Sequence, residues 1–200
     1  MPRPKLHDDA LRIRLLDTAG ALLTSQGPDA LSLRRLAAAA GTSTSAVYAL
    51  FGGKPGVLRA LFIEVFTRFA AHLDMVTPSD DPLADLLAIG RAYRASALDD
   101  PHLYAVMFGS PVPGFEPTPQ DYAHAEATFT LVLDTVRRAV AAGLLRDEDP
   151  GLIATALWAN VHGLVSLELR CAMPAGAVPP GELFEAAIRA NLDGWRVIRS

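Results

Sequence analysis

Apolar residues recur every three or four positions along most of this chain, which is the period of an α-helix with one buried face. One such stripe consists of Tyr122, Ala125, Phe129, Val132, Val136 and Val140. No run of residues alternates between apolar and polar in the manner of a half-buried β-strand. The pattern therefore predicts an all-α fold.

Proline divides the apolar runs into separate helices. Pro is tolerated at the first helical position, and an Asp or Thr just before it can cap the unpaired N–H groups of the first turn. This signature occurs at Asp81-Pro82, Asp100-Pro101, Thr118-Pro119 and Asp149-Pro150. We predict nine helices, near residues 9–26, 33–40, 44–51, 55–73, 82–98, 101–108, 119–142, 150–172 and 180–197.

The composition indicates a globular protein without a membrane segment. Of the 200 residues, 50% are hydrophobic and 20% are charged, so the chain can bury a sizeable core. Apolar stretches are interrupted before the roughly 18 residues that a membrane span needs, and no secretory core follows the basic N-terminus. We expect a cytoplasmic protein with no cofactor and no metal, whose single cysteine, Cys171, is buried.

The net charge of −4 conceals an asymmetry along the chain. Residues 1–54 contain seven Lys or Arg against four Asp or Glu, which leaves eleven against eighteen for residues 55–200. A basic head on an acidic body can attract phosphate locally while the protein stays soluble.

Residues 33–51 have the pattern of a helix-turn-helix. Two short apolar-faced helices flank Gly41, a residue that tolerates the left-handed backbone of a tight turn, and small Ala37 suits the point where the helices cross. Val47 and Leu50 anchor the second helix, whose N-terminus Ser43 can cap. Thr44, Ser45, Tyr48 and Ala49 then point outward, as on a helix that enters the major groove of DNA.

This segment resembles the TetR family of one-component transcriptional regulators. The resemblance runs from about Ile13 to Leu61, and its most specific part is Ala37 to Lys54. Thr42 and Gly53 depart from the family pattern, which usually has Val at the first position and a polar cap at the second.

The resemblance implies a set of DNA contacts. Tyr48 and Lys54 would contact backbone phosphates, and Arg34 would lie where some relatives reach a base edge. The alternative is that Arg34, Arg35 and Lys54 are only solvated surface charges. The predicted DNA-binding residues are Arg34, Ser43, Thr44, Ser45, Tyr48 and Lys54.

The C-terminal part resembles a TetR subgroup with a Trp-x-x-x-His-Gly signature, carried here by residues 157–164 and extended by Tyr93–Ala95 and Pro101–Gly109. Trp158 and His162 are four positions apart and therefore share one helical face. That face could line a ligand pocket, or His162 could be a structural residue that is hydrogen-bonded in the core.

Large side chains in the body are candidates for a pocket, although each could equally be plain core. They are Phe66, Phe69, Tyr93, Tyr104, Met107, Phe108, Phe129, Trp158 and His162. A stripe on the last helix that includes Phe184, Ile188 and Trp195 predicts a dimer seam, with packing inside the monomer as the alternative.

These observations predict a two-domain repressor. Residues 1–54 would bind DNA, and residues 55–200 would bind a small, mostly apolar effector and dimerise on a two-fold operator. An activator, or a dimeric DNA-binding protein without an effector, remains possible. An enzyme is disfavoured because the chain has no His-Glu-x-x-His pair, no Gly-x-Ser-x-Gly elbow and no phosphate-binding loop.

Overall fold

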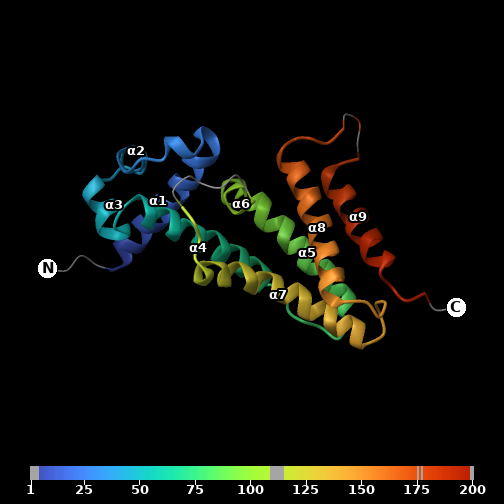
Figure 1. The fold of residues 1–200 in the computed structure, drawn as a ribbon. Helices are drawn as coiled ribbons and strands as arrows, with labels where there is room; N and C mark the ends of the chain where they lie inside the picture. The colour runs from blue at the N-terminus through green and yellow to red at the C-terminus, as the bar shows by residue number, and fades with distance from the viewer. Residues whose placement is uncertain (1–4, 109–114, 175, 177, 199–200) are drawn as a thin grey trace. The chain divides into compact units, whose positions relative to one another are not determined.

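A computed structural model describes residues 5–108, 115–174, 176 and 178–198, and within these ranges it confirms the all-α prediction (Figure 1). The described part of the chain contains nine α-helices, one short 3-10 helix and no strand. The helices are α1 (Lys5–Gln26), η1 (Pro28–Ala30), α2 (Leu33–Ala39), α3 (Thr44–Phe51), α4 (Lys54–Leu73), α5 (Pro82–Asp99), α6 (Pro101–Phe108), α7 (Pro119–Ala141), α8 (Pro150–Leu169) and α9 (Pro180–Gly194).

All four predicted caps are formed. Asp81 Oδ1 accepts from the backbone N–H groups of residues 83 and 84, and Asp100 Oδ1 accepts from that of residue 103. The Asp149 side chain accepts from the N–H of residue 151. Thr118 and Asp121 cap each other: Thr118 Oγ1 accepts from Asp121 N, and Asp121 Oδ2 accepts from Thr118 N at 2.8 Å.

The helix ends differ from the prediction by three or more residues in three places, one of which is the end of α8 at Leu169 instead of residue 172. α1 begins at Lys5, four residues before the predicted start. α9 ends at Gly194 because the next residues pair with the loop after α7: Arg146 N donates to Trp195 O, and Val197 N donates to Leu144 O. Periodicity within α9 gives no information about this pairing with a distant loop.

The chain forms two compact units. Unit 1 comprises residues 1–68 and 100–125, and unit 2 comprises residues 69–99 and 126–200. In unit 1, α1 packs against η1, α2, α3 and α6. Its fully buried side chains include Leu15, Leu36 and Val47. A domain boundary at residue 54 stays a prediction.

Unit 2 contains α5, most of α7, α8 and α9, and the last two helices lie side by side in Figure 1. The α7 stripe predicted from sequence faces its core: Val136 is fully buried, and Phe129, Val132 and Val140 pack around it. Ile153 on α8 and Leu192 on α9 complete the same cluster.

A buried carboxylate fastens the loop before α5. Asp85 accepts hydrogen bonds from Ser79 N and Ser79 Oγ, at 3.0 and 2.7 Å, and pairs with Arg138 at 3.1 Å. Burial is the largest single influence on the pKa of Asp85 and would raise it, but the bonds from Ser79 and Arg138 together hold it below its ordinary value. The Asp85 carboxylate is therefore a stabilising anion inside unit 2.

The expected burial of Cys171 is wrong, whereas the dimer seam expected on α9 stays a prediction. Cys171 is exposed, because α8 ends just before it and its backbone adopts a φ of 52°, a left-handed conformation. On α9, Phe184 and Ile188 are only 2% and 5% exposed, so the monomer's own core takes up both side chains. The Trp195 ring lies against the Arg146 guanidinium, 4.9 Å from it.

Candidate DNA interface and candidate ligand cavity

The helix-turn-helix is formed by α2, a tight turn and α3. Ser32 caps α2 by accepting from Arg35 N, and Ser43 caps α3 by accepting from Ala46 N at 3.1 Å. The turn between them needs Gly41, whose φ is 66°. Ala37 is buried where the helices meet, as its small size requires.

The outward face of α3 lies where the sequence predicts it. Thr44, Ser45 and Ala49 are exposed, and Tyr48 is 57% exposed although its ring is large and apolar. Val47 on the opposite side is fully buried. This face therefore offers hydroxyls and a methyl group, without any charge, to a partner.

The turn from α3 to α4 depends on glycine. Gly52 adopts a φ of 72° and Gly53 a φ of 143°. At Gly56, a Cβ would lie 1.7 Å from the backbone oxygen of Phe51, so only glycine permits the two helices to approach so closely. The directions of α3 and α4 differ by 62° across this turn. Sequence reasoning noted the departure at Gly53 but missed Gly56.

Three cations flank α3 without acidic partners in the part of the chain that the structure describes. Arg34 and Arg35 on α2 are exposed, and Lys54 opens α4. Neither arginine nor Lys54 forms an ion pair there, whereas Arg59 pairs with the buried Asp121 at 3.3 Å. The three charges are therefore available to an external anion such as a DNA phosphate.

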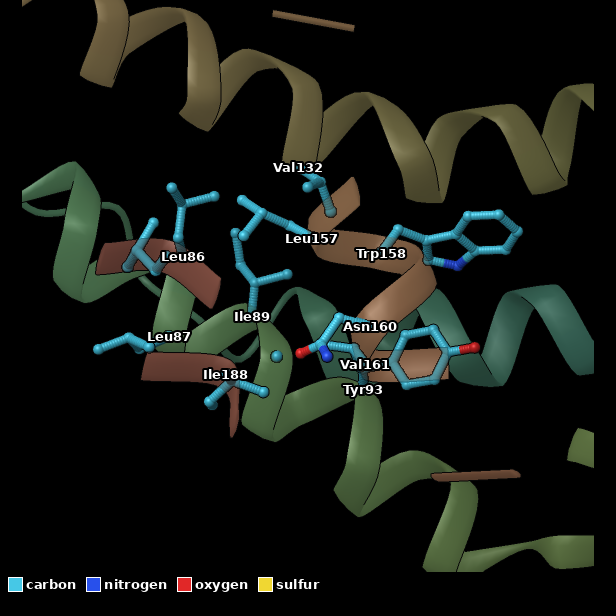
Figure 2. A pocket seen from close by; sticks show the side chains of 12 residues that line it. Leu86, Leu87, Ile89, Tyr93, Val132, Leu157, Trp158, Asn160, Val161 and Ile188 are labelled. Carbon is cyan, nitrogen blue, oxygen red and sulfur yellow. The ribbon is translucent and has the colours of Figure 1, made fainter. Parts of the chain in front are cut away.

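Unit 2 contains a half-open apolar pocket of about 40 Å³ between four helices, called here the cavity (Figure 2). α5, α7, α8 and α9 all contribute to its wall. The lining residues are Leu86, Leu87, Ile89, Gly90, Tyr93, Val132, Leu157, Trp158, Asn160, Val161, Ile188 and Leu192. The present volume suits about one water molecule and is far below the several hundred Å³ of typical ligand sites. A ligand would have to move side chains aside.

One polar atom in this wall is unsatisfied. Asn160 Oδ1 is buried and accepts no hydrogen bond from any residue that the structure describes. By contrast, both ends of the Asn191 amide are hydrogen-bonded: its Nδ2 donates to Ala156 O, and its Oδ1 accepts from Trp195 Nε1 at 3.2 Å. Asn160 was not among the residues predicted from sequence, although a lone amide in the apolar run of α8 was a usable signal.

The Trp-His pair is organised around the cavity wall. His162 Nδ1 is 3.0 Å from the Tyr93 hydroxyl, and the His162 ring stacks on Trp158 with the centroids 5.6 Å apart. Burial, together with the positive charge of Arg170, lowers the pKa of His162 below its ordinary value. His162 therefore orients two lining residues and does not itself line the cavity.

Bidentate ion pairs connect α5 to the last two helices. Arg94 donates to both carboxylate oxygens of Glu168 on α8, at 2.8 and 2.6 Å. Arg91 does the same with Glu185 on α9, at 2.7 and 2.8 Å. The bonds from Arg91 hold the pKa of Glu185 below its ordinary value, against burial. These charges neutralise one another outside the cavity wall.

The predicted pocket residues are divided between the two units. Tyr93 and Trp158 line the cavity, Phe69 packs edge-on against Tyr93 at 5.1 Å, and Phe129 packs against Trp158 at 6.4 Å. The remaining candidates, Phe66, Tyr104, Met107 and Phe108, belong to unit 1. Most of the missed lining residues are aliphatic, and residue type alone does not separate an aliphatic cavity wall from ordinary core.

No cluster of three or more possible metal ligands occurs among the described residues.

Family models match both parts of the chain. Residues 15–61 match "Bacterial regulatory proteins, tetR family", and residues 86–191 match "Tetracyclin repressor-like, C-terminal domain". The first match covers the helix-turn-helix, and the second covers most of the cavity wall. The narrower resemblance to a Trp-x-x-x-His-Gly subgroup stays a prediction.

Individual relatives agree with these matches. The HTH-type transcriptional regulator Rv1816 of Mycobacterium tuberculosis strain H37Rv is 28% identical, and the alignment covers 90% of each chain. A protein with unknown function from Rhodococcus sp. RHA1 is 32% identical with a TM-score of 0.78, covering 94% of this chain and 96% of the other. The TetR family transcriptional regulator PfmR from Thermus thermophilus shares the fold, with a TM-score of 0.75 at 22% identity over 93% and 100% of the two chains. This chain belongs to the tetR family of bacterial transcriptional regulators and carries its helix-turn-helix in residues 33–51.

Proposed function

We propose that this regulator is a homodimeric, cytoplasmic repressor that leaves a two-fold operator when a small, mostly apolar effector enters unit 2. The observation that carries the proposal is the apolar cavity between four helices, whose lining residues include Asn160, a residue with an unsatisfied amide oxygen. A core that served packing alone would be expected to fill such a space and to satisfy such a group.

The outer face of α8 supports dimerisation. Leu152 and Leu167 are 52% and 45% exposed, Ala159 between them is exposed, and a Cβ at Gly163 would meet open space. These four residues, called here the α8 outer face, lie along one side of the helix. α8 is also long and apolar enough to cross a membrane by length and composition alone. In a DNA-binding regulator, a helix with one face in the core and another apolar face exposed suits a subunit interface.

The DNA contacts would follow the geometry of α2 and α3. The exposed face of α3 would enter the major groove, while Lys54 and Tyr48 would contact phosphates and Arg34 would approach a base edge. Two heads in a dimer would reach half-sites about 34–36 Å apart.

One ring contact and the continuous chain of α4 support coupling between the cavity and α3. Tyr93 lines the cavity and packs against Phe69, which lies on α4. Only two residues separate the end of α3 from the start of α4. An effector that displaces Tyr93 would therefore bias the position of α4, and the ligand can shift the equilibrium only by its differential affinity for the two states.

The test combines DNA selection with titration calorimetry. Selection from a random duplex library is expected to enrich a two-fold symmetric site, and absence of any enriched sequence contradicts operator binding. Effector binding with and without that DNA should differ by about 5- to 150-fold, and the reciprocal change in DNA affinity should have the same size. An effector that binds equally in both cases contradicts the switch.

The small volume of the cavity favours one alternative, a dimeric DNA-binding protein with no effector. In that case no member of a metabolite library changes DNA affinity, while the operator is still selected. Reporter transcription in a deletion strain separates repression from activation.

A further inference from the structure

We propose that the cavity selects an uncharged effector that donates an N–H or O–H hydrogen bond to Asn160 Oδ1 and is otherwise apolar. This inference rests on the proposed function, because it specifies the chemical class of the effector. It goes beyond a general preference for apolar ligands by naming the recognised group and the residue that recognises it.

The first observation behind this proposal is the unsatisfied acceptor atom, Asn160 Oδ1. A buried amide oxygen without a donor is costly, because it has lost its bonds to water and gained none from the protein. Asn160 Oδ1 is in this state among the described residues, and it belongs to a residue of the cavity wall. A ligand that supplies a donor recovers this loss, and a ligand that supplies another acceptor cannot.

The Asn191 and Trp195 side chains donate to acceptors other than Asn160 Oδ1. Asn191 Nδ2 donates to Ala156 O, and Trp195 Nε1 donates to Asn191 Oδ1, so this pair satisfies itself between α8 and α9. Asn191 is therefore a structural residue, whereas Asn160 Oδ1 can still accept a hydrogen bond from a ligand.

The second observation behind this proposal is that the cavity wall has no charged side chain. None of the lining residues is an Asp, Glu, His, Lys or Arg. Arg94 and Arg91, which also lie on α5, are each held in a bidentate pair with a glutamate. A carboxylate or ammonium ligand would lose its hydration without gaining a counter-charge, so the site excludes it.

The test uses phenol and toluene, which have nearly the same shape but differ in the presence of an O–H donor. Their dissociation constants are measured by calorimetry on the full-length protein without DNA, for the wild type and for Asn160→Leu. Because toluene is intrinsically the more hydrophobic probe, the quantity of interest is the change in the ratio of the two constants. We expect the substitution to reduce the relative preference for phenol by about tenfold. Asn191→Leu, the control, should leave that ratio unchanged.

A measurement on the wild type makes the test independent of the variant's folding. The ¹³Cγ resonance of the Asn160 side chain should shift on titration with phenol and stay in place with toluene. Benzoate should show no binding at concentrations that saturate phenol.

Three results would overturn the proposal: no binding of phenol up to its solubility, equal ratios in the wild type and Asn160→Leu, or binding of benzoate comparable to that of phenol. The proposed function fails separately. If phenol binds through Asn160 and no neutral donor ligand alters DNA affinity, the chemistry of the cavity stands and the effector response does not.

Discussion

The cations around α3 and the two arginines of α5 serve different purposes in this molecule. Around α3, Arg34, Arg35 and Lys54 have no acidic partner among the described residues. In unit 2, by contrast, Arg91 and Arg94 are committed to carboxylates by bidentate bonds. Overall charge therefore says little about partners, because the charges available to DNA are those that the fold leaves unpaired.

Exposed apolar side chains are distributed in the opposite way to the unpaired cations. The head buries its large side chains apart from a few such as Tyr48, whereas α8 presents an apolar outer face. The region around α3 carries the unpaired cations, and the outer face of α8 is the surface that we propose for the second subunit. Substitutions in either region test this difference, and we expect the largest effect from a substitution on α8.

Leu167→Asp should disrupt the proposed subunit interface on the α8 outer face. In a symmetric dimer each copy would place an unpaired carboxylate in the interface, which costs several kcal/mol. We expect the dimer dissociation constant to rise at least about 10³-fold by sedimentation, with helical content retained. Met75→Asp, at a residue that is 70% exposed outside α8 and α9, is the control. A Leu167→Asp protein that remains dimeric would place the interface elsewhere.

Gly56→Ala should disrupt the turn between α3 and α4. The new methyl group would collide with the Phe51 carbonyl, so the turn between α3 and α4 must distort. We expect a loss of about 2–3 kcal/mol in the free energy of unfolding, measured with urea, and a matching loss of operator affinity. Gly194→Ala, where the Cβ would meet open space, should change neither quantity measurably. Normal DNA binding by Gly56→Ala would show that the close approach is unimportant.

Lys54→Ala tests the contrast between unpaired and paired cations directly. Removal of one phosphate contact should weaken binding to operator and to random duplex alike and reduce the salt slope by about one unit per head. Arg137→Ala removes the same charge from unit 2, where Arg137 pairs with Asp134 at 2.8 Å, and should leave the slope unchanged. A loss confined to operator DNA would instead indicate contact with a base.

His162→Gln should produce the smallest effect and sharpen the account of the cavity wall. Because the pKa of His162 is lowered in the folded state, the unfolded chain binds the proton more readily. Stability is therefore full above the ordinary pKa of 6.5 and declines as the pH falls below it. The decline between pH 7.5 and 5.5, measured by thermal unfolding, should be below about 1 kcal/mol and smaller in His162→Gln. His124→Gln, at an exposed histidine, is the control, and an identical decline in all three proteins would contradict this role.

Local features of the sequence predicted most of the fold. Residues such as Asp81 and Asp100 mark helix starts because their caps involve only the next few N–H groups. The same holds for the turn at Gly41 and for the outward position of Tyr48, which follow from spacing within two short helices.

Features that depend on distant segments were missed. The stripe on α9 shows that Phe184 and Ile188 face an apolar surface, but periodicity does not say whether that surface belongs to the same chain. Position 56 needs glycine because a carbonyl five residues away lies too close for a Cβ. Asn160 Oδ1 is unsatisfied because no described residue of the surrounding helices donates a hydrogen bond to it. Such properties depend on tertiary packing and leave only faint traces in the local pattern.

The order in which the chain builds its two units bears on how this regulator can be re-engineered. The polypeptide passes between the units near residues 68, 99 and 125, so each unit is assembled from separate stretches of sequence. α1 packs against α6, with Leu103 Cδ2 only 3.1 Å from where a Cβ on Gly20 would lie. A chimera that joins this DNA-reading half to the sensor of a relative must therefore carry α6 along with α1, and a single crossover after α3 would pair two surfaces that did not evolve together.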